Sequence, residues 1–209
     1  MNIGVIGSGN VGGTLGTRWA GLGHKVTFSS RNPESQEMKS LVAKAGATAR
    51  STTVAEAAQC EVILLATPWP ATRAALESAG SLEGKLLMDA TNPLKANLAG
   101  LEFGNTTSGA EQVASWAPGA KVVKAFNTVG FGIMANPKFG DRSATLFYCG
   151  DDASAKQTVH QLATELGFTA HDAGPLSQAR VLEPFALLWI KLANVHGYGR
   201  DIAFDLMRR

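Results

Sequence analysis

The residues of this chain best suited to hold a ligand form a glycine-rich segment close to the N-terminus. The segment Gly7-Ser8-Gly9-Asn10-Val11-Gly12 has the Gly-x-Gly-x-x-Gly spacing of a dinucleotide fold. In such a fold the first glycine permits a tight turn, the second lets backbone approach a pyrophosphate, and the third packs a helix on a strand. We therefore predict that these six residues bind a pyrophosphate, with a purely structural turn as the alternative.

A second candidate group lies at the end of the next apolar run, Lys25–Phe28, which is followed by Ser29-Ser30-Arg31. An Asp or Glu at this place would accept hydrogen bonds from a ribose 2′-hydroxyl and would repel a 2′-phosphate. A guanidinium instead binds phosphate through two hydrogen bonds, and hydroxyls can donate to the same oxygens. Ser29, Ser30 and Arg31 therefore predict NADP(H), with an ordinary solvated arginine as the alternative.

Three further loops follow apolar runs of strand length. They are Ala66-Thr67-Pro68, residues 90–93 with Asn92, and residues 127–130 with Asn127. Ligands of open α/β sheets bind at the carboxyl ends of the strands, near the switch in strand order. We expect Ala66, Thr67 and Pro68 to border the cofactor, and Asn92 and Asn127 to orient its nicotinamide. Each loop also fits turn residues that satisfy their own backbone.

No residue is assigned to acid–base catalysis or to a metal. Of the four histidines, only His171 and His196 are expected to approach the cleft, and Asp151-Asp152 has the pattern of a helix cap. Reduction of a carbonyl or an imine requires a positioned proton donor. Hydride transfer between two stacked cofactor rings depends on orientation instead. The sequence therefore favours transfer from one cofactor to another.

Strand and helix patterns alternate along the chain and predict an α/β protein with a Rossmann-type, doubly wound parallel sheet. Strands are expected at residues 2–6, 25–28, 47–50, 61–66, 86–89, 121–126, 145–149 and 169–172. After Pro175, a long helix to about Val195 and a shorter helix over Arg200–Met207 predict a small C-terminal helical lobe. The expected division is an NADP-binding domain over 1–174 and a lobe over 175–209 that supplies the acceptor site and dimer contacts, with Gly174 to Leu176 closing over the acceptor.

Composition narrows the class of protein. The formal net charge is only +2, and the basic residues are scattered, which argues against nucleic-acid binding. Cys60 and Cys149 lack metal-ligand spacing, and no secretory leader or membrane-length apolar run of roughly 18 residues is present, so a reduced, cytoplasmic protein without membrane insertion is expected. The apolar run Phe185–Ile190 predicts a homodimer; the alternative is that it packs on the sheet within one subunit.

Seven segments together carry a resemblance to a known family. They are Gly7-Ser8-Gly9-Asn10-Val11-Gly12, Ser29-Ser30-Arg31, Ala66-Thr67-Pro68, Asp89-Ala90-Thr91-Asn92-Pro93, Lys124-Ala125-Phe126-Asn127-Thr128, Cys149-Gly150-Asp151-Asp152 and Asp172-Ala173-Gly174-Pro175-Leu176. With them, the chain resembles the NADP oxidoreductase, coenzyme F420-dependent family, which includes the cytosolic NADPH domain of the STEAP metalloreductases. Archaeal deazaflavin:NADP oxidoreductases have His-Thr after the sixth strand, whereas this chain has Asn127-Thr128, as STEAP-type domains do.

The resemblance implies an NADP-dependent oxidoreductase that transfers hydride between NADP(H) and a small-molecule acceptor, the 5-deazaflavin F420 or a flavin. It also implies a cytoplasmic protein that is dimeric through its C-terminal helices. Two other functions remain open. Asn127 favours a STEAP-like NADPH:flavin or ferric reductase, and the lack of a catalytic acid or base is compatible with a binding module that senses NADPH without turnover.

Overall fold

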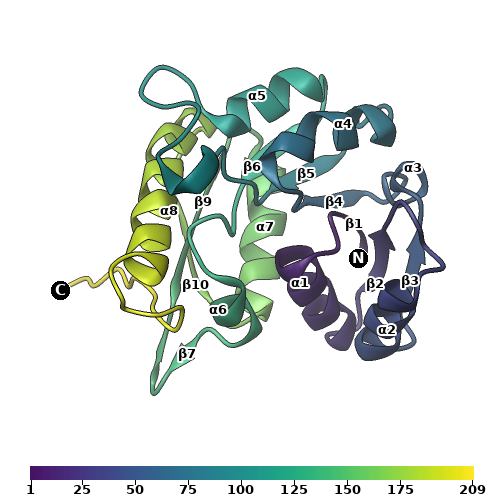
Figure 1. Ribbon diagram of the computed structural model, residues 1–209, viewed down its shortest axis with the longest axis horizontal. Helices are drawn as coiled ribbons and strands as arrows, with labels where there is room; N and C mark the ends of the chain where they lie inside the picture. Colours follow the sequence, from purple (N-terminus) through teal and green to yellow (C-terminus); the bar gives the residue numbers. More distant parts are fainter.

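The computed structural model describes all of residues 1–209, and its centre is an eight-stranded sheet (Figure 1). The strand order is β10-β9-β6-β5-β4-β1-β2-β3. The strands are β1 Asn2–Ile6, β2 Lys25–Ser29, β3 Ala49–Thr52, β4 Val62–Leu65, β5 Leu86–Asp89, β6 Lys121–Lys124, β9 Thr145–Gly150 and β10 Thr169–Asp172, with a separate hairpin of β7 Lys138–Phe139 and β8 Arg142–Ser143. β1 to β6 are mutually parallel, and the order reverses beside β1, which is the doubly wound arrangement expected.

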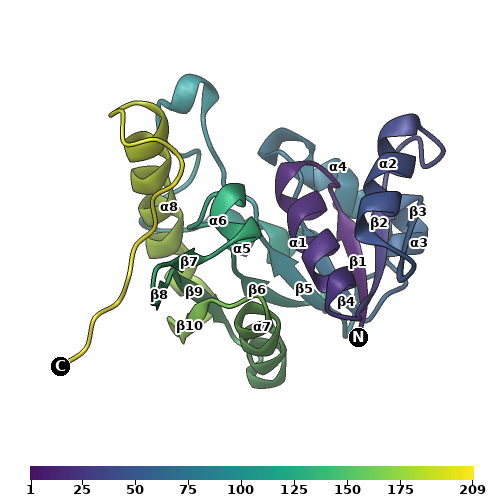
Figure 2. The same cartoon turned by 90° about the horizontal axis from the view of Figure 1, so that it is seen from below.

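Helices cover both faces of this sheet. They are α1 Asn10–Gly21, α2 Gln36–Ala45, α3 Val54–Ala57, α4 Trp69–Ala79, α5 Gly109–Trp116, α6 Phe131–Ala135, α7 Ala153–Glu165 and α8 Ala179–Asn194, with short 3₁₀ turns at Ala96–Leu98 and Leu176–Gln178. Side chains of α1, α2, α6 and α7 enter one apolar core, and those of α4, α5 and α8 enter a second. Figure 2 shows α8 and the C-terminal segment at the opposite end of the molecule from α2 and β3.

The strands are continuous apolar runs because both faces of the sheet are buried. In β4, Val62 and Leu64 belong to one core while Ile63 and Leu65 belong to the other. The predicted cap of α7 is confirmed, since the Asp152 carboxylate accepts hydrogen bonds from the Ser154 hydroxyl (2.6 Å) and the Ala155 amide (2.8 Å). These hydrogen bonds, together with Lys121, hold the pKa of Asp152 well below its usual range.

The last two strands run in the opposite direction to the first six. β9 pairs antiparallel with β6, so the carboxyl end of β9 lies at the edge where the other strands begin. The segment after β10 is fixed at this same edge, because Gly150 N donates to Gly174 O (3.1 Å) and Leu176 N donates to the Asp151 carboxylate (2.9 Å). The expectation that Gly174 to Leu176 close over an acceptor at the carboxyl edge is therefore wrong.

The C-terminal region holds one long helix rather than two helices. α8 passes through Pro184 without being split, and no helix of the structure is both long and apolar enough to cross a membrane. The predicted helix over Arg200–Met207 is wrong, because this segment is extended and bonded to other elements. Trp189 Nε1 donates to Ile202 O (2.7 Å), and Thr145 N donates to Phe204 O (3.1 Å). Backbone carbonyl groups of this tail therefore accept hydrogen bonds from distant residues instead of from amides within a helix.

Candidate functional site

The three glycines of the turn between β1 and α1 differ in how much space the surrounding protein leaves for a side chain. Gly7 has φ +99°, and a Cβ there would lie 2.6 Å from the carbonyl carbon and oxygen of Ala66. A Cβ at Gly12 would lie 2.0 Å from Gly7 O. Both positions therefore exclude larger residues for reasons of folding. Gly9 differs, because a Cβ there would meet no heavy atom within 4 Å.

The space in front of Gly9 is also the N-terminus of α1. Gly9 is the N-cap residue of α1, and no side chain accepts a hydrogen bond from the amides at this end of the helix. The first turn also contains no acidic residue. The backbone amides at this helix end are therefore available to an anion, and the helix dipole favours one there.

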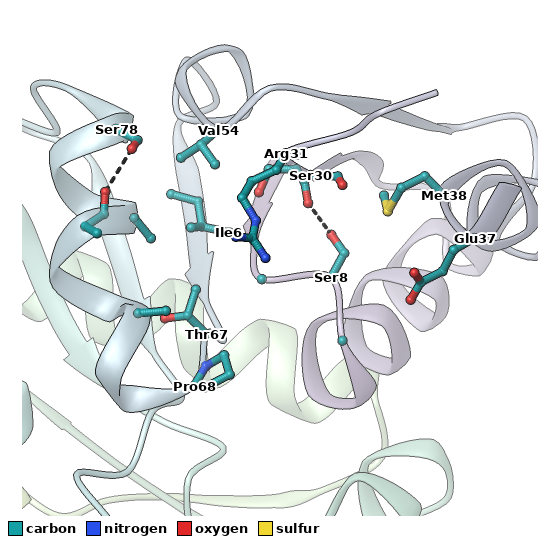
Figure 3. A pocket seen from close by; sticks show the side chains of 16 residues that line it. Ile6, Ser8, Ser30, Arg31, Glu37, Met38, Val54, Thr67, Pro68 and Ser78 are labelled. Atoms are coloured by element: carbon teal, nitrogen blue, oxygen red, sulfur yellow. Dashed lines mark hydrogen bonds between the residues drawn. The ribbon is translucent and has the colours of Figure 1, made fainter. Parts of the chain in front are cut away.

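A first cavity of about 430 Å³ opens on one side of the turn (Figure 3). It is lined by Ile6, Gly7, Ser8, Gly9, Ser29, Ser30, Arg31, Glu37, Met38, Val54, Thr67, Pro68, Ala71, Ala74, Ala75 and Ser78. The exposed Arg31 extends into it and forms no ion pair, while Ser8 Oγ donates to Ser29 O (2.9 Å) and braces the turn against the end of β2. The Ser29 side chain is buried and that of Ser30 half-buried.

Glu37, the single acidic residue that lines this cavity, was not predicted from the sequence. It lies in the first turn of α2, where a carboxylate is favoured by the helix dipole. Figure 3 shows its carboxylate across the cavity from Arg31, on the side of Ser8. Glu37 and Arg31 therefore give the lining one negative and one positive charge.

A second cavity of about 470 Å³ continues from the first past the glycine turn. Its lining is Gly7, Gly9, Asn10, Val11, Ala66, Thr67, Pro68, Trp69, Pro70, Ala90, Thr91, Asn92 and Leu94. Gly7, Gly9, Thr67 and Pro68 line both cavities, so the two form one elongated cleft. Only Gly12 and Asn127 among the fourteen predicted contact residues line neither cavity: Gly12 is packed beneath the turn, and Asn127 lies behind Asn92.

The two asparagines are bonded to each other. Asn92 Nδ2 donates to Asn127 O (3.0 Å), and Asn127 Nδ2 donates to Asn92 Oδ1 (3.2 Å) and to Leu182 O (3.3 Å). Asn127 Oδ1 is buried and has no hydrogen-bond partner, and the same is true of the Thr128 hydroxyl. The pair thus joins the loop after β5 to the loop after β6 and to α8.

Three charged residues behind these loops were not singled out as a group from the sequence. Lys124 Nζ lies 2.9 Å from Asp89 Oδ2 and 3.0 Å from Glu183 Oε1, and all three side chains are at most 1% exposed. Burial alone would lower the pKa of Lys124, but the two carboxylates outweigh it and hold that pKa above its usual value. The sequence did contain a signal for such a group, since Asp89 and Lys124 are charged residues within apolar runs. A charged side chain that is buried requires a partner of opposite charge.

None of the histidines lines either cavity. His24 Nε2 lies 2.8 Å from the Glu165 carboxylate, and the ring of His171 lies beside Phe147 in the outer part of the sheet. His160 and His196 are exposed. No group of three His, Cys, Asp or Glu side chains is placed to hold a metal ion. Burial raises the pKa of the Cys149 thiol to about 12, so this cysteine remains protonated at neutral pH.

Comparison with known proteins agrees with the fold. The family model for NADP oxidoreductase, coenzyme F420-dependent, matches residues 2–93. Metalloreductase STEAP3 of Rattus norvegicus is 35% identical over 187 residues, which are 88% of this chain and 36% of that protein. The chain thus spans 36% of the length of the curated metalloreductases that it matches.

Solved structures resemble the whole chain. A protein from Arthrobacter sp. FB24, described as an F420-dependent NADP-reductase, has a TM-score of 0.89 at 32% identity, with 99% of each chain covered. The hypothetical protein SMa0349 from Sinorhizobium meliloti has a TM-score of 0.76 at 28% identity, with 86% of this chain and 87% of that chain covered. The chain therefore belongs to the NADP oxidoreductase, coenzyme F420-dependent family, a family of NADP-dependent oxidoreductases.

Proposed function

We propose that the joined cavities bind one NADP(H) molecule along their length. The pyrophosphate lies over Gly9 and the N-terminus of α1, where Ser8, Asn10 and Val11 surround it. Ser29, Ser30 and Arg31 bind the 2′-phosphate at one end. Ala66, Thr67 and Pro68 border the middle of the cofactor, and Asn92, held by Asn127, orients the nicotinamide at the other end.

The open space at Gly9 carries this proposal. Gly9 has φ −76°, which any residue adopts, and no atom of the protein stands where a side chain would project. Glycine is therefore not required there by the fold, in contrast to Gly7 and Gly12. A ligand that contacts the N-terminus of α1 would occupy this space, which explains why residue 9 has no side chain.

The reaction that fits this site is hydride transfer between NADP(H) and a small redox acceptor, with F420 or another flavin-like ring as the acceptor. NADPH would supply the hydride, with its two electrons, from the nicotinamide C4 and leave as NADP⁺, and the ring nitrogen of the reduced acceptor would take its proton from solvent. The protein holds the nicotinamide end from one side through the loops after β4, β5 and β6. No titratable side chain of the second cavity is positioned as a proton donor, which favours an acceptor that takes up hydride directly.

A second candidate, a STEAP-like NADPH:flavin or ferric reductase, is favoured by Asn127-Thr128 and by the similarity to STEAP3. An NADPH-sensing module without turnover is the third. NADPH oxidation should be followed with F420, FMN, riboflavin and a ferric chelate as separate acceptors. Turnover with F420 or with a flavin, but not with the ferric chelate, supports the first candidate. Turnover with the ferric chelate but not with F420 supports the second, and NADPH binding without any turnover supports the third.

Hydride transfer without a general acid predicts that no histidine is required for turnover. We expect His171→Ala and His196→Ala to retain the rate of NADPH oxidation within a few-fold, because neither lines the cleft. A loss of more than about 10²-fold at unchanged stability and cofactor affinity would have the size of a general acid–base contribution. That result would contradict the deazaflavin assignment and point to reduction of a carbonyl or an imine.

We also propose that residues 175–209 form the dimer contacts of a cytoplasmic protein. The outward face of α8 carries Val181 and Leu188, and Val195 directly follows the helix; the three are 61%, 49% and 61% exposed. Trp189 and Ala186 face inward and are buried, so only part of the apolar run packs within the subunit.

The expected result is a dimeric mass by light scattering at micromolar concentration. Leu188→Glu should shift the protein toward the monomer, because it places a charge in the centre of the apolar face. Leu22→Glu is the matched control, since Leu22 is similarly exposed but follows α1. A monomeric mass for the unmodified protein would contradict the proposed dimer.

A further inference from the structure

The buried charges of Asp89, Lys124 and Glu183 lie at the point where three segments of the nicotinamide end of the cleft meet. The Lys124 ammonium donates to Asp89 Oδ2 (2.9 Å) and to Thr91 O (2.6 Å), and it lies 3.0 Å from Glu183 Oε1. An ammonium has three donor positions, so this one is fully used. The partners come from β5, from the loop after β5 and from α8.

The loop after β5 is held at several atoms by this cluster. Asp89 Oδ1 accepts hydrogen bonds from Thr91 N (2.9 Å) and from the Thr91 hydroxyl (2.7 Å), while Thr91 O accepts from Lys124. Thr91 lines the second cavity and directly precedes Asn92. The position of Asn92 in the cleft therefore depends on the buried charges.

The loop after β6 is held from two sides. Phe126 precedes Asn127 with φ +66°, an unfavourable conformation for a bulky residue, and its fully buried ring packs edge-on against Trp19. From the other side, Asn127 Nδ2 donates to Leu182 O, one residue before Glu183. A shift of α8 would therefore move the partner of Asn127.

Glu183 ties α8 to the sheet in two ways. Its carboxylate lies against Lys124, and it also accepts hydrogen bonds from the first amides of α5, Gly109 N (2.8 Å) and Ala110 N (3.0 Å). Two carboxylates face one ammonium, and the amides at the start of α5 stabilise the excess negative charge. Apolar residues of similar volume can replace such a buried ion cluster without loss of stability, so stability alone does not account for it.

We propose that Lys124 is a positioning residue for the nicotinamide end of the site, and that Glu183 transmits this constraint to α8. The cluster holds Thr91 directly, Asn92 through Thr91, and Asn127 through α8, so that the Asn92 amide faces the nicotinamide in one arrangement with Asn127 bonded behind it. This inference rests on the proposed binding of NADP(H) along the cleft. It adds that α8, the helix proposed to form the dimer contact, is mechanically connected to the place of hydride transfer.

Lys124→Met is the first variant, and its readout is the ratio of two affinities. NADPH and 2′-phospho-ADP-ribose share the adenosine and pyrophosphate groups, but only NADPH has a nicotinamide. We expect the variant to bind the fragment within about twofold of the unmodified protein, while its preference for NADPH over the fragment falls at least tenfold. We also expect kcat to fall by about 10² at a nearly unchanged KM for the acceptor, the size of a small misplacement of reacting groups.

Lys124→Met leaves two buried carboxylates without a cation. If that variant does not fold, Glu183→Gln replaces it in the test. It leaves the Lys124–Asp89 pair electrically neutral, and the same fall in the affinity ratio and in kcat is expected. Lys121→Met is the matched control, because Lys121 lies on the same strand but is partly exposed and paired with Asp152. It should change neither quantity.

The proposal is overturned if folded Lys124→Met, or Glu183→Gln in its place, keeps both the affinity ratio and kcat within twofold. It is also overturned if affinities for NADPH and for the fragment fall together, since that result describes a general structural role. Failure of the unmodified protein to bind NADPH more tightly than the fragment would contradict the proposed cofactor arrangement instead. The two failures are thus distinguishable.

Discussion

Gly9→Val abolishes NADPH binding while leaving the protein folded: this is the largest effect that we expect from a single substitution. The valine side chain would project into the open space where the pyrophosphate is proposed to lie, and no protein atom within 4 Å of the Cβ position opposes it in the free protein. We expect an affinity loss of at least about 100-fold, about 2.7 kcal/mol. Calorimetric titration with NADPH measures it.

Gly12→Val provides the contrast. A Cβ at this position would lie 2.0 Å from Gly7 O and 2.8 Å from a methyl group of Val5, so the expected damage is to the fold. The midpoint temperature of thermal unfolding should fall strongly in Gly12→Val and little in Gly9→Val. NADPH affinity retained within a few-fold in Gly9→Val would show that the turn is merely structural.

Arg31→Ala is expected to remove most of the preference for NADPH over NADH. The unmodified protein should bind NADPH at least about tenfold more tightly, which is about 1.4 kcal/mol. A hydrogen bond to a charged group contributes roughly 1.5–3 kcal/mol, so loss of the guanidinium is sufficient to remove this difference. Titrating both cofactors into both proteins gives the result.

Two further variants test whether charge at this cavity is the cause. Arg50→Ala removes an arginine from the neighbouring strand, where its Nε donates to Thr27 Oγ1 away from the cleft, and should leave the preference unchanged. Glu37→Gln removes the one negative charge of the lining and should increase the preference. Equal affinities of the unmodified protein for NADH and NADPH would contradict the assignment of the 2′-phosphate site.

The parts of the structure that the sequence predicted well are those specified by neighbouring residues. Gly7 to Gly12 follow a strand and begin a helix within one short unit, so the turn that they form is specified locally. The apolar runs of β4 and β5 are long enough to indicate buried strands by themselves. Thr67, Pro68 and Asn92 then follow from the rule that ligands bind where parallel strands end, and all three line the cleft.

The parts that were missed depend on contacts between distant segments. The reversed direction of β9 and β10 is a property of the pairing with β6, and the composition of the strands does not encode it. The tail over residues 200–207 is extended because Thr145 and Trp189 bind its backbone, which outweighs a weak helical pattern. Glu183 reaches Lys124 across 59 residues of sequence, a partnership that no local spacing indicates.

Deuterium transfer tests the central claim most directly. In a single turnover, the protein receives F420 and NADPH that is deuterated at the transferred position of the nicotinamide C4, and the reduced deazaflavin is examined by mass spectrometry. Hydride transfer places the deuterium on a carbon of the acceptor, so the account predicts one deuterium per reduced F420. Where hydride transfer limits the turnover rate, a primary isotope effect should accompany it. Reduced F420 that carries only solvent hydrogen, or no reduction of F420 while NADPH is bound, would contradict direct hydride transfer to this acceptor.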